Sequence, residues 1–341
     1  MRITSKKLLA ILFAATLLSA ACIRSKHPTD VLLKVDDATQ AQLLAEVNRW
    51  ASVNSIHAKM DLKFEDNSFA VFGEKEVYRT ADGDVTVERP GRILLKVQVP
   101  VIKSDVAQMT SDGEKFRVAI LQDGGSGKYK KFVKGSNNAD YTRLQKKIDP
   151  SQLKTSQESV NAFANMRPQH FTDALLVRPT DSDHLYTDST IYEHETSTSG
   201  PVTRGYYLLD EFVKSADGGL IVSRRFWFDR VGGMRLARQQ LFDVKGEIES
   251  DIVYGKPGTL GASGGFTNVP LDIQVTRPKE HYSLRFTYQT PELALIGRDY
   301  PAEAFVLQNT WNLEEVDLDK RLAEADVTPQ ADNKSANTIT H

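Results

Sequence analysis

Cysteine is almost absent from this chain, and neither sign of charge is in clear excess. Cys22 is the only cysteine among 341 residues, so the chain cannot form an internal disulfide or a cluster of thiolates around zinc. The 43 basic and 45 acidic side chains give a net charge of −2, which provides no positive field for nucleic acid. We therefore expect no nucleic-acid partner, and we predict no metal and no cofactor.

Motifs that carry catalysis are also missing. The 7 histidines include no HExxH motif, and the single cysteine has no histidine in a catalytic arrangement with it. Residues 181–195 are rich in Asp, Glu and His, but no two of these histidines have the i, i+4 spacing of a zinc-binding helix. The sequence therefore predicts a protein that is not an enzyme.

The N-terminus carries a short apolar run at residues 8–18, which is shorter than the roughly 20 residues that a membrane-spanning helix needs. Basic residues precede the run, and small residues and then Cys22 follow it, which is the order of a secretory signal. The arrangement resembles a bacterial lipoprotein signal, whose cysteine is acylated and becomes the mature N-terminus. Leu18 lies one position further from the cysteine than in the usual pattern. An ordinary secretory signal, with Cys22 as a bystander, is the alternative.

The lipoprotein interpretation makes residues 1–21 a signal peptide and residues 22–35 a tether. Acyl chains on Cys22, palmitate among them, then insert into membrane lipid, and more than one chain is what stable anchoring requires. Ile23 follows the cysteine, whereas Asp at that position retains lipoproteins in the inner membrane under the enteric sorting rule. We therefore predict a chain that is lipid-anchored to the cell outer membrane and faces the periplasm.

Apolar spacing predicts one helix near the start of the folded part. Asp37 or Thr39 is placed to cap it, and its apolar residues, Trp50 among them, recur at the i, i+3, i+4 spacing of one stripe. After residue 54 the apolar period changes to two, which indicates strands. We expect the helix to lie across the concave face of a sheet, opposite the wall that residues 85–132 form.

Strand patterns fill most of the remaining chain. Residues 85–132 have the pattern of consecutive antiparallel strands, with apolar side chains on one face and Arg92 on the other. Gly113 is expected to supply the positive φ of a Ser-Asp-Gly turn, and another turn is predicted at Asp82-Gly83. Further strands are predicted at residues 206–210, 220–228, 235–242, 249–254, 273–276 and 282–288.

These elements predict a mainly β fold of the α+β class. We expect a single curved antiparallel sheet that forms an incomplete barrel, covered by an N-terminal helix and by a mid-chain helical insert. Strands on both sides of that insert suggest one domain built in two passes, spanning residues 36–318. Residues 319–341 are polar and are expected to form a disordered tail.

Three strand motifs occur in order: Arg89-Pro90-Gly91, a strand that ends before Pro100, and Ser-Asp-Gly before Phe116. Together they resemble the LolA/LolB-like lipoprotein-carrier superfamily, clearly over residues 36–135. The resemblance implies a half-barrel whose apolar interior holds acyl chains and whose mouth is gated by an arginine. In the carriers, Phe-Arg follows Pro-Gly directly. In this chain Arg92-Ile93 follows Pro-Gly, so the arginine comes before the apolar residue, and Arg92 is the candidate for the gating arginine.

The resemblance also implies a lipid-binding cavity, whose ligand is a lipid acyl chain or an acylated lipoprotein. Two alternatives stay open: the same side chains form a plain core, or a structural or assembly lipoprotein binds a protein partner in its groove. An interior emptied of large side chains favours lipid, and a filled interior favours the partner. The cavity candidates are Trp50, Met60, Leu62, Phe64, Ile93, Leu95, Val97, Phe116, Phe163, Phe171, Leu175, Phe226 and Phe228.

Acylation of Cys22 can be tested on the chain purified from its own membrane. We expect mass spectrometry of the mature N-terminal peptide to find an acylated Cys22, and the Cys22→Ser variant to leave the membrane fraction. An Ile23→Val variant, which keeps the cysteine, is the control and stays membrane-bound. A free Cys22 thiol, or cleavage at another residue, contradicts the lipoprotein interpretation.

Overall fold

The computed structural model describes residues 31–66, 76–77, 80–100, 104–122, 127, 130–139, 141, 144, 167–197, 200–215, 217–262 and 266–327. Cys22, the signal peptide and Phe163 lie outside these residues, so the predictions about them stay predictions. Within the described part, no helix is long and apolar enough to cross a membrane.

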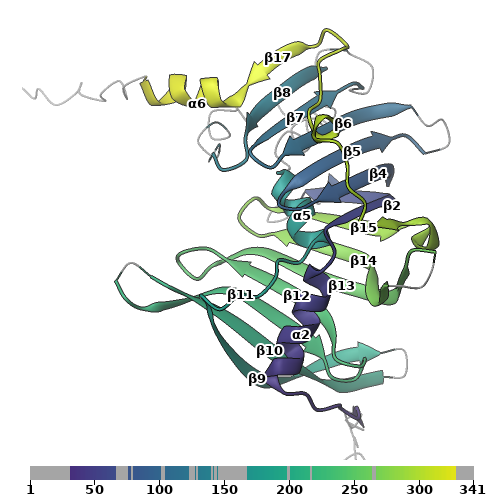
Figure 1. Cartoon of the computed structure of the whole chain (residues 1–341), viewed down its shortest axis with the longest axis vertical. Helices are drawn as coiled ribbons and strands as arrows, with labels where there is room; N and C mark the ends of the chain where they lie inside the picture. Colours follow the sequence, from purple (N-terminus) through teal and green to yellow (C-terminus); the bar gives the residue numbers. More distant parts are fainter. Residues whose placement is uncertain are drawn as a thin grey trace, which may run out of the picture.

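Strands dominate the described residues and join into one sheet, which confirms the mainly β fold (Figure 1). The helices are α2 (Gln40–Ala51), α5 (Pro168–Leu175) and α6 (Leu318–Val327), with 3-10 turns η3 (Pro291–Leu293) and η4 (Ala302–Phe305). The strands are β1 (Val31–Leu32), β2 (Ser55–Asp66), β3 (Glu76–Val77), β4 (Ala81–Glu88), β5 (Arg92–Gln98), β6 (Asp105–Asp112), β7 (Lys115–Ile120), β8 (Lys131–Ser136), β9 (Leu185–Ser197), β10 (Gly200–Lys214), β11 (Leu220–Asp229), β12 (Arg235–Phe242), β13 (Ile248–Leu260), β14 (Phe266–Arg277), β15 (Tyr282–Tyr288), β16 (Leu295–Ile296) and β17 (Glu314–Asp317).

The sheet is built outward from β2. One edge of β2 pairs with β4 from Ser55 to Leu62, and the other edge pairs with β15 from Met60 to Asp66 and with β16 at Ile56 and His57. From β4 the chain meanders to β8, passes through α5, begins again at β9 and returns through β10 to β15. The two meanders therefore meet on the two edges of one strand.

The sheet is antiparallel except at two short strands. β1 pairs in parallel with β10, and β17 pairs in parallel with β8, which corrects the expectation of a wholly antiparallel sheet. Both are short strands next to the chain termini, added alongside the meander. Within the described residues β9 and β17 lie at opposite ends of the strand order and do not pair, so the sheet stays open as an incomplete barrel.

Helix α2 lies across the concave side of β9–β13, not opposite β4–β8 as predicted (Figure 1). The Trp50 ring packs on Tyr254 of β13 at 5.2 Å between centroids, and Arg49 donates to the carbonyl of Thr267 at 3.1 Å. At the other end of α2 the Gln40 side chain donates to the carbonyl of Tyr186 at 3.2 Å. The apolar stripe of α2 can pack on any apolar surface of the sheet, and the second meander provides that surface.

Two glycines show where the turn predictions hold and fail. Gly113 has a φ of 103° in the turn between β6 and β7, as predicted. Gly83 is not in a turn but within β4, facing the interior, and a Cβ there would lie 2.6 Å from Cδ1 of Leu62. The glycine makes room for a neighbouring side chain, so the predicted turn at Asp82-Gly83 is wrong.

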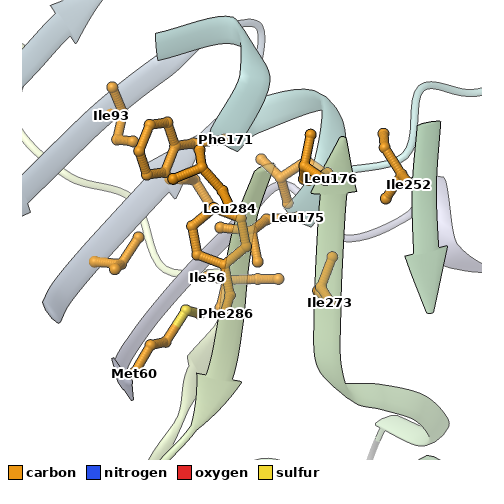
Figure 2. Close-up of a cluster of buried hydrophobic side chains, with 14 of the residues drawn as sticks. Ile56, Met60, Ile93, Phe171, Leu175, Leu176, Ile252, Ile273, Leu284 and Phe286 are labelled. Atoms are coloured by element: carbon orange, nitrogen blue, oxygen red, sulfur yellow. The ribbon is translucent and has the colours of Figure 1, made fainter. Parts of the chain in front are cut away.

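The concave face carries one continuous apolar core. Alternate residues of both meanders point inward, so Met60, Ile93 and Phe286 converge below α5 although they come from distant parts of the chain (Figure 2). Phe171 of α5 contacts the ring of Phe286 at 5.2 Å between centroids. The core therefore ties both halves of the sheet to one short helix.

The segment after β15 packs on the outer face of the sheet. Phe305 is fully buried, the Leu307 amide donates to Oγ1 of Thr110 at 3.0 Å, and Ser55 donates to the carbonyl of Arg298 at 2.6 Å. The chain then adds β17 to β8 and continues into α6. The predicted disordered tail is therefore wrong for its first residues, because Leu318–Val327 is helical.

Removal of the Phe286 ring tests the core. We expect Phe286→Ala to lower the free energy of unfolding by about 3–5 kcal/mol, because it leaves a cavity in a site with no exposed surface. Gln274→Ala on the exposed outer face of β14 is the control and is expected to change it by less than about 0.5 kcal/mol. Equal losses in both variants, measured by denaturant unfolding, contradict the packing described here.

Candidate functional site

The region around α5 is where the predicted cavity residues meet. The helix begins at Pro168, whose missing N–H costs nothing at the first helical position, and ends where the Leu176 amide donates to the Thr172 carbonyl at 2.8 Å. Its buried side includes Phe171 and Leu175, two of the cavity candidates from the sequence. The helix packs against strands β4, β5, β6 and β14, so it covers the junction between the two meanders.

Most cavity candidates do come together, but as a filled core. Leu62 is half-buried against the same cluster, and Phe163 is outside the described residues. The other candidates have between 0% and 8% of their surface exposed, and all belong to one buried cluster. They are Trp50, Met60, Phe64, Ile93, Leu95, Val97, Phe116, Phe171, Leu175, Phe226 and Phe228.

Arg92 does not point into the interior. Its Nη1 donates to Oε1 of Glu88 at 2.7 Å, and its guanidinium lies 5.8 Å from the ring centroid of Phe305 on the outer face. Strand alternation explains the placement, because Ile93 occupies the inward position that follows. The prediction that Arg92 gates the interior is therefore corrected: it holds the C-terminal segment against the back of the sheet.

A polar layer lies beneath the start of α5. His170 is 6% exposed, and its Nδ1 is hydrogen-bonded to the Tyr282 hydroxyl. Arg277 is the cross-strand neighbour of Tyr282 and donates to Glu280 at 2.7 Å. Burial first, and then the charges of Arg277 and Arg167, hold the pKa of His170 well below its usual value, so the ring is neutral. The hydrogen bond between His170 and Tyr282 ties the start of α5 to β15.

A second buried polar cluster holds the connection between α5 and β9. Arg224 is 4% exposed, and its Nε donates to Glu211 at 2.8 Å. Its Nη1 donates to the Arg178 carbonyl at 2.8 Å and its Nη2 to the Pro179 carbonyl at 2.9 Å. The Tyr186 hydroxyl donates to Glu211 at 2.8 Å. Burial alone would raise the pKa of Glu211, but hydrogen bonds from Arg224 and its charge keep that pKa below the usual value. The cluster fixes the start of β9.

The outer face of the second meander is polar and internally paired. Bidentate arginine–carboxylate pairs join neighbouring strands: Arg225 with Asp210, and Arg238 with Asp251. The alternation of arginine with aromatic residues in β11 and β12 is visible in the sequence, but the acidic partners depend on strand register and were missed. These pairs neutralise charge between neighbouring strands of β10–β13.

Three described surface hollows lie away from the interior. The largest of these, about 530 Å³, is lined by apolar and polar residues in equal number at the tips of the β10–β11 and β12–β13 hairpins, including Ile221, Phe242 and Val244. Two others of about 380 Å³ lie beside β17 and beside Phe266. Each is open to solvent and shallow compared with a ligand-enclosing cavity.

Residues 181–184 of the acidic and histidine-rich stretch form a turn, and the rest of the stretch lies in β9. The Asp181 carboxylate accepts hydrogen bonds from the amides of Asp183 and His184, at 2.8 and 3.1 Å, and from the His184 ring at 2.6 Å. Among the residues that the structure describes, no group of three or more His, Cys, Asp or Glu side chains is placed to hold a metal ion.

An open, curved sheet with helices on its concave face defines a half-barrel fold. No protein-family model matches the chain, and no curated protein matches its sequence. A LolA superfamily protein from Nitrosomonas europaea is 12% identical, with 80% of this chain and 99% of that chain covered and a TM-score of 0.41. That superfamily is the one that the sequence motifs resemble.

Two further structures are similar at the same level. A DUF1329 family protein from Desulfovibrio piger is 8% identical, with 77% of this chain and 94% of that chain covered and a TM-score of 0.39. A protein described as an outer membrane lipoprotein-sorting domain, from Vibrio parahaemolyticus, is 9% identical, with 78% and 95% covered and a TM-score of 0.39. These likenesses are distant, and none of them transfers a ligand or a partner to this chain.

Acidification is expected to weaken the packing of α5. Because folding lowers the pKa of His170, the unfolded chain binds a proton on this histidine more readily than the folded chain does. The free energy of unfolding is therefore unaffected by His170 above the unfolded pKa of about 6.5, and it decreases as the pH falls below that value. His170→Gln keeps a polar side chain and cannot titrate. We expect the wild-type free energy of unfolding to fall more steeply from pH 7 to pH 5, by up to about 1.4 kcal/mol per pH unit. If the free energy of unfolding falls equally steeply with pH in the wild type and in His170→Gln, this prediction is contradicted.

Proposed function

We propose that this chain is a non-catalytic binding protein of the bacterial cell envelope that binds a protein partner on its surface. The filled interior carries the proposal. Phe226, Phe228 and Phe286 have no exposed surface, and Ile93 and Met60 have none either. A side chain that lines a cavity large enough for ligand atoms keeps accessible surface, so these side chains serve as packed core.

The chemistry of the exposed surface agrees with a protein partner. The outer face carries paired charges, and one long strand lies at an open edge of the sheet. The non-catalytic role is part of the same proposal, and the buried His170–Tyr282 and Arg224–Glu211 contacts serve to hold the fold together. The envelope location rests on the predicted signal and on Cys22.

A second candidate function is the binding of an acyl chain that displaces α5. The observation in its favour is the helix itself: it has only 8 residues, and Arg167 at its N-cap makes no side-chain hydrogen bond to it. Helices this short are marginal on their own and depend on tertiary packing. If α5 moved, the apolar side chains below it would be uncovered. In the described structure that space is occupied by Phe171 and Leu175.

Lipid content separates the two candidates. We expect protein produced without residues 1–22 to carry no stoichiometric acyl lipid by mass spectrometry and to show no saturable, displaceable binding of a fluorescent fatty acid. The Phe171→Ala variant provides the positive control, because it opens space beneath α5 and is expected to take up the probe more readily than wild type. Stoichiometric lipid in the wild type would favour the acyl ligand and reject the surface-binding proposal.

A further inference from the structure

β9 is a long strand with an open outer edge. Its inner edge pairs with β10 over the whole of Leu185–Ser197, and within the described residues no strand pairs with its outer side. In an antiparallel strand, every second residue directs its amide and carbonyl away from the partner. The outer edge of β9 therefore presents a row of backbone donors and acceptors at a regular spacing.

Several of the devices that protect an edge strand are missing from β9, although it carries carboxylates. Natural edges are short, or contain proline, lysine or a bulge. β9 has 13 residues, none of them proline or lysine, and its register with β10 runs without a shift. Register shifts do occur in β11–β14, which lie inside the sheet. The regular strand thus lies at the edge, where a further strand can add to it.

The strand is also held rigidly. Tyr186 is tied to the buried pair of Glu211 and Arg224, and Gln40 of α2 donates to the Tyr186 carbonyl at 3.2 Å and to the Asp188 carboxylate at 3.0 Å. An edge that is already ordered loses little conformational entropy when another strand pairs with it. This lowers the free-energy cost of adding a strand.

The charge of the edge indicates the kind of strand that fits. Residues 185–197 contain three carboxylates, Asp188, Glu193 and Glu195, and no lysine or arginine. Arg204 pairs with Glu195 at 3.0 Å and lies opposite Glu193 in the register, and Arg238 also interacts electrostatically with Glu193. Asp188 has no cationic partner among the ion pairs described. A cationic strand beside β9 would gain cross-strand attraction, whereas a second copy of β9 would bring its own three carboxylates alongside.

The other end of the sheet shows this mode of pairing within the chain itself. There β17 adds to β8, and its acidic residues pair with lysines of β8: Glu315 lies 3.1 Å and Asp317 3.8 Å from Nζ of Lys134, and Glu314 pairs with Lys131. A basic edge is thus covered by an acidic strand of the same chain. β9 has the opposite charge and has no such cover among the described residues.

We infer that the open edge of β9 binds an extended segment of a partner protein that carries lysine or arginine at alternate positions. The segment pairs with β9 as an added strand and places its basic side chains beside Asp188 or Glu193. This inference rests on the proposed function, and it names the surface and the chemical class of the partner segment.

A labelled synthetic peptide tests the pairing on the full chain in detergent. The probe has 13 residues, to match β9, with lysine and valine alternating, and the control peptide has glutamate for lysine. We expect the lysine peptide alone to bind saturably and to slow amide hydrogen exchange in residues 185–197. In the Asp188→Lys/Glu193→Lys variant its affinity is expected to fall roughly tenfold. The control variant, Asp299→Lys/Glu303→Lys, makes the same change in charge on an exposed segment elsewhere. We expect it to bind the lysine peptide as the wild type does.

Two outcomes would overturn the inference. One is that the lysine peptide does not slow amide hydrogen exchange in residues 185–197, or that it loses affinity equally for both charge-reversed variants. Either result would mean that the peptide binds elsewhere or without specificity. The other is a wild-type dimer, seen by sedimentation, that Asp188→Lys/Glu193→Lys disrupts, because the edge would then serve a second copy. Neither outcome affects the lipid measurement, so failure of this inference is distinguishable from failure of the proposed function.

Discussion

The pairing of β2 along both of its edges is the constraint on which this fold depends. β4 occupies one edge and β15 with β16 the other, so two meanders that are separate in the sequence become one sheet. The same pairing aligns their inward faces, and the apolar residues of both halves then share a single core below α5. Without β2 each half would expose an apolar face and an edge to solvent, which few isolated sheets tolerate.

The state of the two faces of the sheet is the reason why we propose that a protein partner binds outside the interior of the half-barrel. The concave face is filled by side chains of the sheet, α2 and α5, and the convex face is neutralised by arginine–carboxylate pairs. The C-terminal segment covers the back of β2 and β4–β6 and fixes Arg92 there. The edge of β9 and the shallow hollow at the hairpin tips are among the surfaces that stay available in the described chain.

The sequence predicts what is local and leaves open what depends on long-range packing. Alternation correctly places Ile93 inward and Arg92 outward, because the side-chain period of a strand is set by its backbone. It does not say which surface covers α2, so the helix was expected on the wrong half of the sheet. Gly83 looked like a turn residue, since its real constraint, the Leu62 side chain, lies on another strand. Whether apolar side chains fill an interior or line a cavity depends on volumes that no pattern contains.

A crystal structure of the protein purified from its native membrane would show whether the interior is packed by the chain's own side chains. We expect continuous side-chain density for Phe171, Leu175 and Phe286 beneath α5, with no elongated density between them. Tubular density of an acyl chain in that space, with α5 displaced from β4 and β14, would contradict it.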